Sequence, residues 1–289
     1  MDACVENKVL LWLKIVRPQT LPASLCPVAV GLIVSGIQRP WVAVITAFCA
    51  LSLQIFSNLV NDYYDFARGT DKKGRAGFKR ALAEGLVTRK QMLCACVVSF
   101  VLAVLSGLYL VFAGGWPVLL IGVTALLFAW LYTATGHSLS YLGIADIFVF
   151  LYYGIIASTG TAWLQLVPDV QWPALLQSMW AGAGCGLISM CVLITNNVRD
   201  IETDRLAGKR TFPVRFGKRA GETGYLVVVL LVPVAAYLAF GWCWAMFALV
   251  PALALYRKFL RSEGAQYNKC LMLAGLLNIL YVILCFFSV

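Results

Sequence analysis

Nine apolar stretches, separated by short polar segments, make up most of this chain of 289 residues. Most of them approach the roughly 20 residues that an α-helix needs to cross the hydrocarbon core of a bilayer, and the eighth is shorter. Because backbone polar groups in lipid need partners within the protein, the pattern predicts an all-α bundle of nine transmembrane helices in a single domain, residues 1–289. The predicted spans are residues 15–37, 41–64, 90–113, 116–134, 142–166, 173–198, 222–240, 242–256 and 269–288.

The composition supports this prediction. Hydrophobic residues account for 61% of the chain and charged residues for 12%, and the mean hydropathy is +0.84. Soluble domains are only about 45–50% apolar, so we expect an integral membrane protein whose partner is the lipid bilayer. The net charge of +10 does not indicate a nucleic-acid partner, because most of the cations lie in loops between apolar stretches.

The lysine and arginine residues predict the orientation of the bundle. Cytoplasmic loops of membrane proteins carry an excess of these residues. If the N-terminus is cytoplasmic, nine spans leave Arg39 as the one cation of 23 on the outer side. This pattern predicts a cytoplasmic N-terminus, and two long polar loops at residues 66–90 and 199–221 on the cytoplasmic side. Short outer loops and many free thiols are typical of a bacterial inner-membrane protein.

Each of the two long loops follows an apolar helix that ends in a similar polar motif, so the motif is an internal repeat. In both motifs an asparagine and an aspartate are four residues apart, and therefore lie on one face of a helix. In the predicted topology both helices end on the cytoplasmic side, where the motifs can face each other. The motifs are Asn61-x3-Asp65-x3-Gly69, with Asp62 beside it, and Asn196-x3-Asp200-x3-Asp204.

Carboxylate and amide oxygens in this arrangement are suited to Mg²⁺, which binds through one or two carboxylates together with substrate phosphates. The sequence therefore predicts a clamp for a magnesium-bridged diphosphate, with metal ligands Asn61, Asp62, Asp65, Asn196, Asp200 and Asp204. Cations in the adjoining loops could hold the phosphate oxygens. The candidate diphosphate-binding residues are Lys72, Arg75, Lys79, Arg80, Arg199, Lys209 and Arg210.

Other interpretations stay open at this point. The basic loops could be topology signals that contact anionic lipids, and the aspartates could simply be solvated at helix ends. Acids and internal repeats are also features of ion-coupled transporters. A transporter, however, places its ionisable residues near the middle of the membrane, whereas these acids lie at one side beside basic loops. Asp146 differs because it lies a few residues inside the fifth apolar stretch, where an acid is a functional candidate.

At its motifs the chain resembles a known family. The segments that carry the likeness are Asn61-Asp62-Tyr63-Tyr64-Asp65, Leu139-Ser140-Tyr141-Leu142-Gly143-Ile144-Ala145-Asp146, Asn196-Asn197-Val198-Arg199-Asp200 and Arg17-Pro18-Gln19-Thr20-Leu21-Pro22. They resemble segments of the UbiA superfamily of intramembrane aromatic prenyltransferases. Within it, the likeness is closest to the branch that prenylates 1,4-dihydroxy-2-naphthoate.

The resemblance implies nine transmembrane helices, with Mg²⁺ and a polyprenyl diphosphate held by the two aspartate-rich motifs. It also implies transfer of the polyprenyl group to 1,4-dihydroxy-2-naphthoate with loss of CO₂, which gives demethylmenaquinone. Other aromatic acceptors such as 4-hydroxybenzoate remain alternatives, and no oligomeric state is predicted. The expected catalytic residues are Asp65 and Asp200 at the metal, Tyr132 facing an allylic cation, and Asp146 accepting a proton or orienting a ring hydroxyl.

Overall fold

The computed structural model describes residues 8–69, 80–131 and 143–289, and in these ranges the regular secondary structure is entirely helical. Short helices flank the long ones or interrupt them. The longer helices are α1 (Lys8–Ile15), α2 (Leu21–Ser35), α3 (Pro40–Ala67), α4 (Arg89–Gly114), α5 (Trp116–Leu131), α8 (Ala157–Leu166), α9 (Trp172–Arg199), α12 (Lys218–Phe240), α13 (Leu249–Leu260) and α14 (Tyr267–Phe286). The shorter ones are η1 (Pro18–Thr20), α7 (Ala145–Phe150), η2 (Leu151–Ile156), α10 (Ile201–Leu206), α11 (Phe212–Phe216), η3 (Trp244–Ala248) and η4 (Gly264–Gln266).

Seven helical segments in the described ranges are long and apolar enough to cross a membrane. They are Lys8–Ser35, Pro40–Ala67, Arg89–Gly114, Ala145–Leu166, Trp172–Arg199, Lys218–Phe240 and Gly264–Phe286. The other two predicted spans correspond to α5, whose apolar segment is shorter, and to α13, which has 12 residues. The expectation of an all-helical membrane protein is confirmed, whereas the count of nine crossings and the orientation stay predictions.

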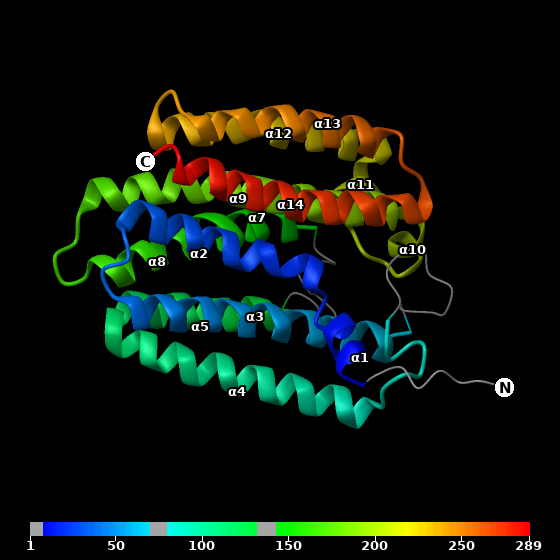
Figure 1. Ribbon diagram of the computed structural model, residues 1–289. Coiled ribbons are helices and arrows are strands. Elements are labelled where there is room, and N and C mark those ends of the chain that lie inside the picture. Colours follow the sequence, from blue (N-terminus) through cyan, green and yellow to red (C-terminus); the bar gives the residue numbers. More distant parts are fainter. Residues whose placement is uncertain (1–7, 70–79, 132–142) are drawn as a thin grey trace.

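The long helices run roughly along a common axis (Figure 1), and α9 lies at the centre of the bundle. It packs against α12 and α14 on one side and against η2, α8 and α2 on the other. Small residues allow this central position, because Ala181, Ala183, Gly184 and Gly186 are buried along α9. Interfaces between membrane helices are typically rich in small residues, which let backbones approach closely.

One close approach of this kind joins η2 to α9 at glycines. A Cβ atom added to Gly154 would lie 2.7 Å from the Gly186 Cα atom and 2.8 Å from the Gly182 carbonyl oxygen. Gly154 is part of a single π-helical segment that interrupts the span from α7 to α8, with Tyr153 at φ −90° and ψ 16°. Such π-turns often occur at functional sites because they change the direction of neighbouring side chains.

The two ends of the bundle differ in character. One end holds the short helices α10 and α11 and the C-terminal end of α3, and we call it the α10–α11 end (Figure 1). Arg39 lies at the opposite end. Its Nη1 atom donates to the carbonyl oxygens of Ala113 at 2.9 Å and Leu164 at 3.1 Å, near the C-terminal ends of α4 and α8. A cation at this position satisfies carbonyls that helix ends leave without partners.

Large apolar side chains are exposed on the outer faces of the bundle. Examples are Val97 and Phe112 on α4, Leu230 on α12 and Leu276 on α14. Apolar surface of this extent is costly in water, since burying it from water contributes about 25 cal/mol per Å². The exposure therefore fits a lipid-facing surface.

Candidate active site

One cavity of about 560 Å³ opens inside the bundle, lined by residues from η1, α2, α3, α4, α5, α7, η2, α8, α9, α10 and α14. Helix α3 shows how the character of this cavity changes along its length. The lining residues of α3 recur every three or four positions and therefore form one stripe along the helix. From Thr46 to Asp65 this stripe covers about 28 Å, at 1.5 Å per residue. The stripe consists of Thr46, Cys49, Ala50, Leu53, Gln54, Ser57, Asn58, Asn61 and Asp65.

Three zones follow from this order. The charged zone lies at the α10–α11 end, where Asn61 and Asp65 of α3 meet the end of α9. The middle zone is polar and neutral. The third zone is mainly apolar, with Cys49, Leu53, Leu110, Val118, Leu126 and Phe128 among its lining residues. A cavity of this kind fits an amphiphile with an anionic head, a polar centre and a hydrocarbon tail.

In the first motif the structure separates Asp62 from its neighbours. Asn61 and Asp65 line the cavity, but Asp62 is not among the lining residues. Asp62 is buried, with 4% of its surface exposed. Its Oδ1 atom accepts from Arg17 Nη2 and from Arg80 Nη1 at 2.8 Å. Both arginines line the cavity, so Asp62 holds two cations at the charged zone.

The second motif lies opposite, at the end of α9 and in α10. Asn196, Asp200 and Asp204 all line the cavity. Arg199 binds Asp200 through two hydrogen bonds, from Nε to Oδ1 at 2.8 Å and from Nη2 to Oδ2 at 2.7 Å. The Nη1 atom of Arg199 also donates to Asn268 Oδ1 on α14 at 2.7 Å. A bidentate pair of this kind fixes the geometry of both side chains.

Lys209 connects the two motifs. Its Nζ atom lies 3.5 Å from Asp204 Oδ1 and 3.9 Å from Asp65 Oδ1. The facing of the motifs that was inferred from the repeat is therefore present in the structure. Lys209, Arg80 and Arg199 all line the cavity, as expected for candidates that bind a diphosphate.

The oxygen donors of the charged zone fit Mg²⁺. Among the described residues no group of three or more His, Cys, Asp or Glu side chains is already gathered as a metal site. The chemistry of the donors nevertheless fits, because the carboxylates of Asp65, Asp200 and Asp204 and the amides of Asn61 and Asn196 line one cavity. These are hard oxygen donors of the kind that Mg²⁺ uses together with substrate phosphates. Arg199 pairs with Asp200, and Lys209 lies near Asp65 and Asp204.

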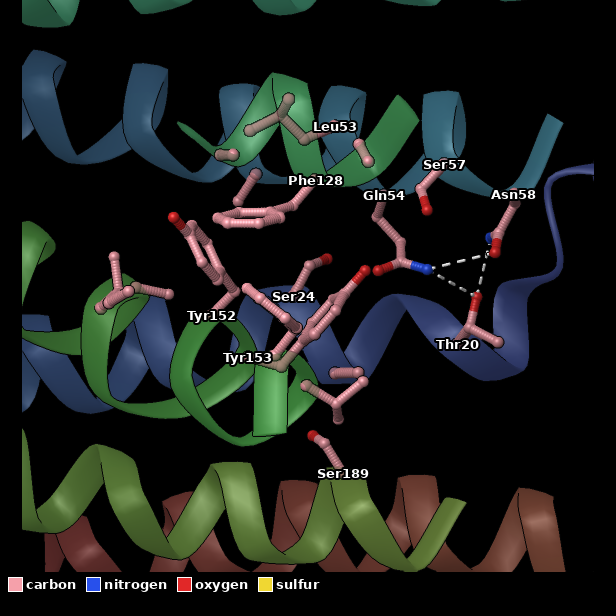
Figure 2. A pocket seen from close by; sticks show the side chains of 18 of the residues that line it. Thr20, Ser24, Leu53, Gln54, Ser57, Asn58, Phe128, Tyr152, Tyr153 and Ser189 are labelled. Atoms are coloured by element: carbon pink, nitrogen blue, oxygen red, sulfur yellow. Dashed lines mark hydrogen bonds between the residues drawn. The ribbon is translucent and has the colours of Figure 1, made fainter. Parts of the chain in front are cut away.

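The middle zone is built on a hydrogen-bonded group of three side chains (Figure 2). Gln54 Nε2 donates to Asn58 Oδ1 at 3.2 Å and to Thr20 Oγ1 at 3.4 Å, and Asn58 Nδ2 donates to Thr20 Oγ1 at 2.9 Å. Asn278 of α14 lines the same cavity, and its Nδ2 atom donates to the Cys185 carbonyl oxygen at 3.3 Å. Serines and tyrosines complete this zone, including Ser24, Ser57, Ser189, Tyr152 and Tyr153.

Tyr152 and Tyr153 are adjacent in sequence, yet both line the cavity. In a regular α-helix adjacent side chains point about 100° apart, and adjacent residues of α3 such as Leu53 and Gln54 line the cavity in the same way. Figure 2 shows Tyr152 near Phe128 and Tyr153 extending toward Gln54. The rings of Phe128 and Tyr152 are 5.2 Å apart, edge to face. Aromatic side chains therefore line the boundary between the middle and apolar zones.

Several predicted site residues are not at the cavity. Asp146 lies in the first turn of α7, where a carboxylate is favoured by the helix dipole, and it is not among the lining residues. Arg210 is not among them either, and its carbonyl oxygen packs against Gly143. Four further candidates lie outside the described residues, so their roles stay predictions: Lys72, Arg75, Lys79 and Tyr132.

The sequence analysis did not single out Arg17, Gln54 or Asn278 as site residues. Arg17 has φ 56°, and within the described ranges no other non-glycine residue has a positive φ. Strained backbone of this kind is often found at functional sites. For Gln54 and Asn278 a signal was available, because an amide side chain within an apolar span needs partners.

The comparisons with known proteins agree with this geometry. The model of the UbiA prenyltransferase family matches residues 24–286. A 1,4-dihydroxy-2-naphthoate octaprenyltransferase from Escherichia coli (strain K12) is 33% identical over 273 residues, covering 87% of this chain and 85% of that protein.

Solved structures show the same fold. The apo structure of a UbiA homolog from Aeropyrum pernix K1 superposes with a TM-score of 0.70 at 14% identity, covering 92% of this chain and 98% of that one. A UbiA homolog from Archaeoglobus fulgidus bound to DMAPP and Mg²⁺ gives a TM-score of 0.61 at 18% identity, with coverages of 95% and 97%. The chain therefore belongs to the UbiA prenyltransferase family and is an aromatic prenyltransferase embedded in the membrane.

Proposed function

We propose that this protein transfers a polyprenyl group from an allylic diphosphate to 1,4-dihydroxy-2-naphthoate, with loss of CO₂, and so makes demethylmenaquinol, the reduced form of demethylmenaquinone, for menaquinone biosynthesis. The observation that carries the proposal is the order of zones in the cavity, from charged through neutral polar to apolar. This order matches a diphosphate, an aromatic ring and an isoprenoid tail. The name of the E. coli relative supports the naphthoate as the acceptor.

The charged zone binds the diphosphate. Arg80, Arg199 and Lys209 line it, and each can exchange an aspartate partner for a phosphate oxygen. Bound Mg²⁺ would act as a Lewis acid that stabilises the negative charge on the leaving diphosphate. Asn61, Asp65, Asn196, Asp200 and Asp204 are the residues that would hold it, because they line the charged zone. A UbiA homolog from Archaeoglobus fulgidus has been solved bound to DMAPP and Mg²⁺.

Asp62 has a different part in this proposal from the one expected from the sequence. Because it accepts from Arg17 and Arg80, it positions these two arginines at the charged zone. A buried carboxylate between two arginines is compensated by charge-assisted hydrogen bonds. We therefore assign Asp62 as a positioning residue and add Arg17 to the residues that bind the diphosphate.

The chemistry forms one bond and breaks two. The carbon–oxygen bond of the allylic diphosphate breaks, and its electron pair leaves with the diphosphate. A ring carbon of the acceptor then forms a carbon–carbon bond to the allylic carbon, and the ring regains its electron pair when the carboxyl group leaves as CO₂. The apolar zone excludes water from the allylic cation, which would otherwise be hydrolysed. Tyr132 keeps its predicted catalytic role. Asp146 does not line the cavity, so its predicted role needs a test of its own, and normal turnover by Asp146→Asn would remove it.

The topology is part of the same proposal. Nine crossings with a cytoplasmic N-terminus place the charged zone at the cytoplasmic side, where Lys and Arg are concentrated. A bacterial inner membrane fits this orientation. In that location the diphosphate would enter from the cytoplasmic side and the tail would lie within the bilayer.

The test uses detergent-purified protein with an allylic polyprenyl diphosphate, Mg²⁺, and either 1,4-dihydroxy-2-naphthoate or 4-hydroxybenzoate in parallel. We expect a prenylated, CO₂-releasing reaction with the naphthoate, and none after EDTA is added. Product with the benzoate alone would overturn the acceptor assignment and leave prenyl transfer in place. Product that persists in EDTA would overturn the role of the metal.

A further inference from the structure

The middle zone holds a buried acceptor that has no donor. Gln54 has 6% of its surface exposed, and its Oε1 atom has no hydrogen-bond partner among the described residues. Figure 2 shows the amide nitrogen turned toward Asn58 and Thr20 and the oxygen turned the other way, toward the side of the pocket where Tyr153 lies. A buried polar atom of this kind costs stability, so its retention indicates a function or a missing partner.

The orientation of the Gln54 amide is fixed, through Thr20 and Asn58, by backbone carbonyl oxygens, which can only accept hydrogen bonds. The carbonyl oxygen of Arg17 accepts from Thr20 Oγ1 at 2.9 Å, so the Thr20 hydroxyl proton is already in use. Thr20 Oγ1 must then accept from Asn58 Nδ2, which also donates to the carbonyl oxygen of Val16 at 3.2 Å. Backbone carbonyls carry no proton, so Asn58 cannot be rotated to reverse these bonds.

The orientation of the Gln54 amide follows from this orientation of Asn58. Because Asn58 uses its nitrogen for Val16 and Thr20, its oxygen accepts from Gln54 Nε2. Gln54 must therefore present its oxygen, and not its nitrogen, to the cavity. The carbonyl groups of residues 16 and 17 in this way determine which end of the Gln54 amide, oxygen or nitrogen, faces the cavity.

We propose that Gln54 determines acceptor specificity by receiving a hydrogen bond from a ring hydroxyl of the aromatic acceptor. The inference rests on the proposed function, because it assumes that the ring binds in the middle zone. An amide oxygen attracts a hydroxyl proton and repels a carboxylate. The residue therefore favours a ring with a free hydroxyl at this point and disfavours a ring that places a carboxylate there.

The test compares Gln54→Met with the unchanged protein, using the naphthoate and two analogues that carry a methoxy group in place of either the 1- or the 4-hydroxyl. We expect Gln54→Met to raise the KM for 1,4-dihydroxy-2-naphthoate by about 10- to 100-fold, the worth of a buried hydrogen bond. The KM for the allylic diphosphate should not change. The variant should also turn over one of the two analogues as well as the unchanged protein does, because the contact is already lost there.

Two further variants distinguish this role from a structural one. Thr20→Val should raise the KM for the naphthoate less than Gln54→Met does, because it removes only a group that orients the amide. Gln165→Met is the matched control, since Gln165 is equally buried but binds Arg39 at the other end of the bundle. Acceptor binding should also be measured directly, by quenching of protein fluorescence with the naphthoate alone.

The outcomes separate this inference from the proposed function. If the unchanged protein makes prenylated naphthoate while Gln54→Met has the same acceptor KM and the same analogue profile, the role of Gln54 is overturned and the function stands. If the variant slows all three acceptors by one factor, Gln54 is structural and the inference also fails. If the unchanged protein makes no product from the naphthoate, the proposed function itself fails.

Discussion

The ammonium group of Lys209, in the second motif, lies 3.9 Å from the carboxylate of Asp65, in the first. The same group lies 3.5 Å from Asp204. Two buried aspartates from distant parts of the sequence therefore share one lysine. A diphosphate bound with Mg²⁺ would bring new partners to all three side chains: the metal for the two aspartates and phosphate oxygens for the lysine.

Lys209→Met should weaken binding of the allylic diphosphate. Loss of a charge-assisted hydrogen bond costs about 1.5–3 kcal/mol, or about 10- to 100-fold in KM. Without substrate the variant should also be less stable, because Asp65 and Asp204 lose a shared cation. Mg²⁺ should raise its Tm more than that of the unchanged protein. Lys218→Met, which affects a partly exposed pair with Glu222 away from the cavity, serves as the control, and equal Tm shifts with Mg²⁺ would contradict the assignment.

Asp62→Asn and Asp65→Asn should fail in different ways. Asp65 lines the cavity, so its loss should lower kcat by about 100-fold or more and raise the Mg²⁺ concentration needed for half-maximal rate. Asp62 contacts Arg17 and Arg80 instead. Asp62→Asn should raise the KM for the diphosphate and leave the Mg²⁺ half-saturation unchanged. A magnesium titration of both variants decides the matter, and a matching shift for Asp62→Asn would return that residue to the metal ligands.

Gly154→Ala should disturb the packing of η2 on α9. Its added methyl group would meet backbone atoms of Gly182 and Gly186, which cannot rotate away as a side chain can. Overpacking of this kind costs about 1–3 kcal/mol, and it should also lower activity because Tyr152 and Tyr153 are displaced. Gly224→Ala is the control, since the nearest atom is 3.8 Å away. Thermal unfolding in detergent compares the stability of the two variants, and prenyl-transfer assays compare their activity. A stable, active Gly154→Ala protein would show that η2 and α9 are less tightly packed at this point.

The orientation of the chain can be tested at its ends. Helix α1 lies at the α10–α11 end, whereas α14 ends at the opposite end (Figure 1), which requires an odd number of crossings. With a cytoplasmic N-terminus, alkaline phosphatase fused after Val289 should be active in a bacterial host, and green fluorescent protein at the same position should be dark. A fluorescent, phosphatase-inactive pair of fusions would mean that the C-terminus is cytoplasmic.

Much of the fold could be predicted from the sequence, because apolar length and the asymmetry of Lys and Arg depend on the solvent and not on detailed packing. The pairing of the two motifs could also be predicted, since Asn61 and Asp65 repeat at Asn196 and Asp200. Apolar pattern alone could not decide the crossings at α5 and α13, because both are shorter than a typical span.

The remaining parts of the site depend on contacts between residues far apart in the chain. Asp62 is one position from Asn61, yet its partners are Arg17, 45 residues before it, and Arg80, 18 residues after it. The polarity of Gln54 is set by carbonyl groups of residues 16 and 17. The π-turn at Tyr153 lies next to Gly154, which packs closely on α9. Helical periodicity contains none of this information.

The graded stripe on α3 has a consequence for turnover. Under the proposed function, the substrate is anchored at Asp65 and Asn61 by its diphosphate, and its tail follows the apolar residues toward Thr46. After the transfer, the tail belongs to an uncharged quinol, and nothing on that molecule is left to engage the charged zone. The two products therefore leave by different routes. The diphosphate is released to water at the α10–α11 end, and the prenylated ring is released sideways into lipid. Inhibition by accumulated product should accordingly come from diphosphate, which competes for the anchor, and far less from the quinol.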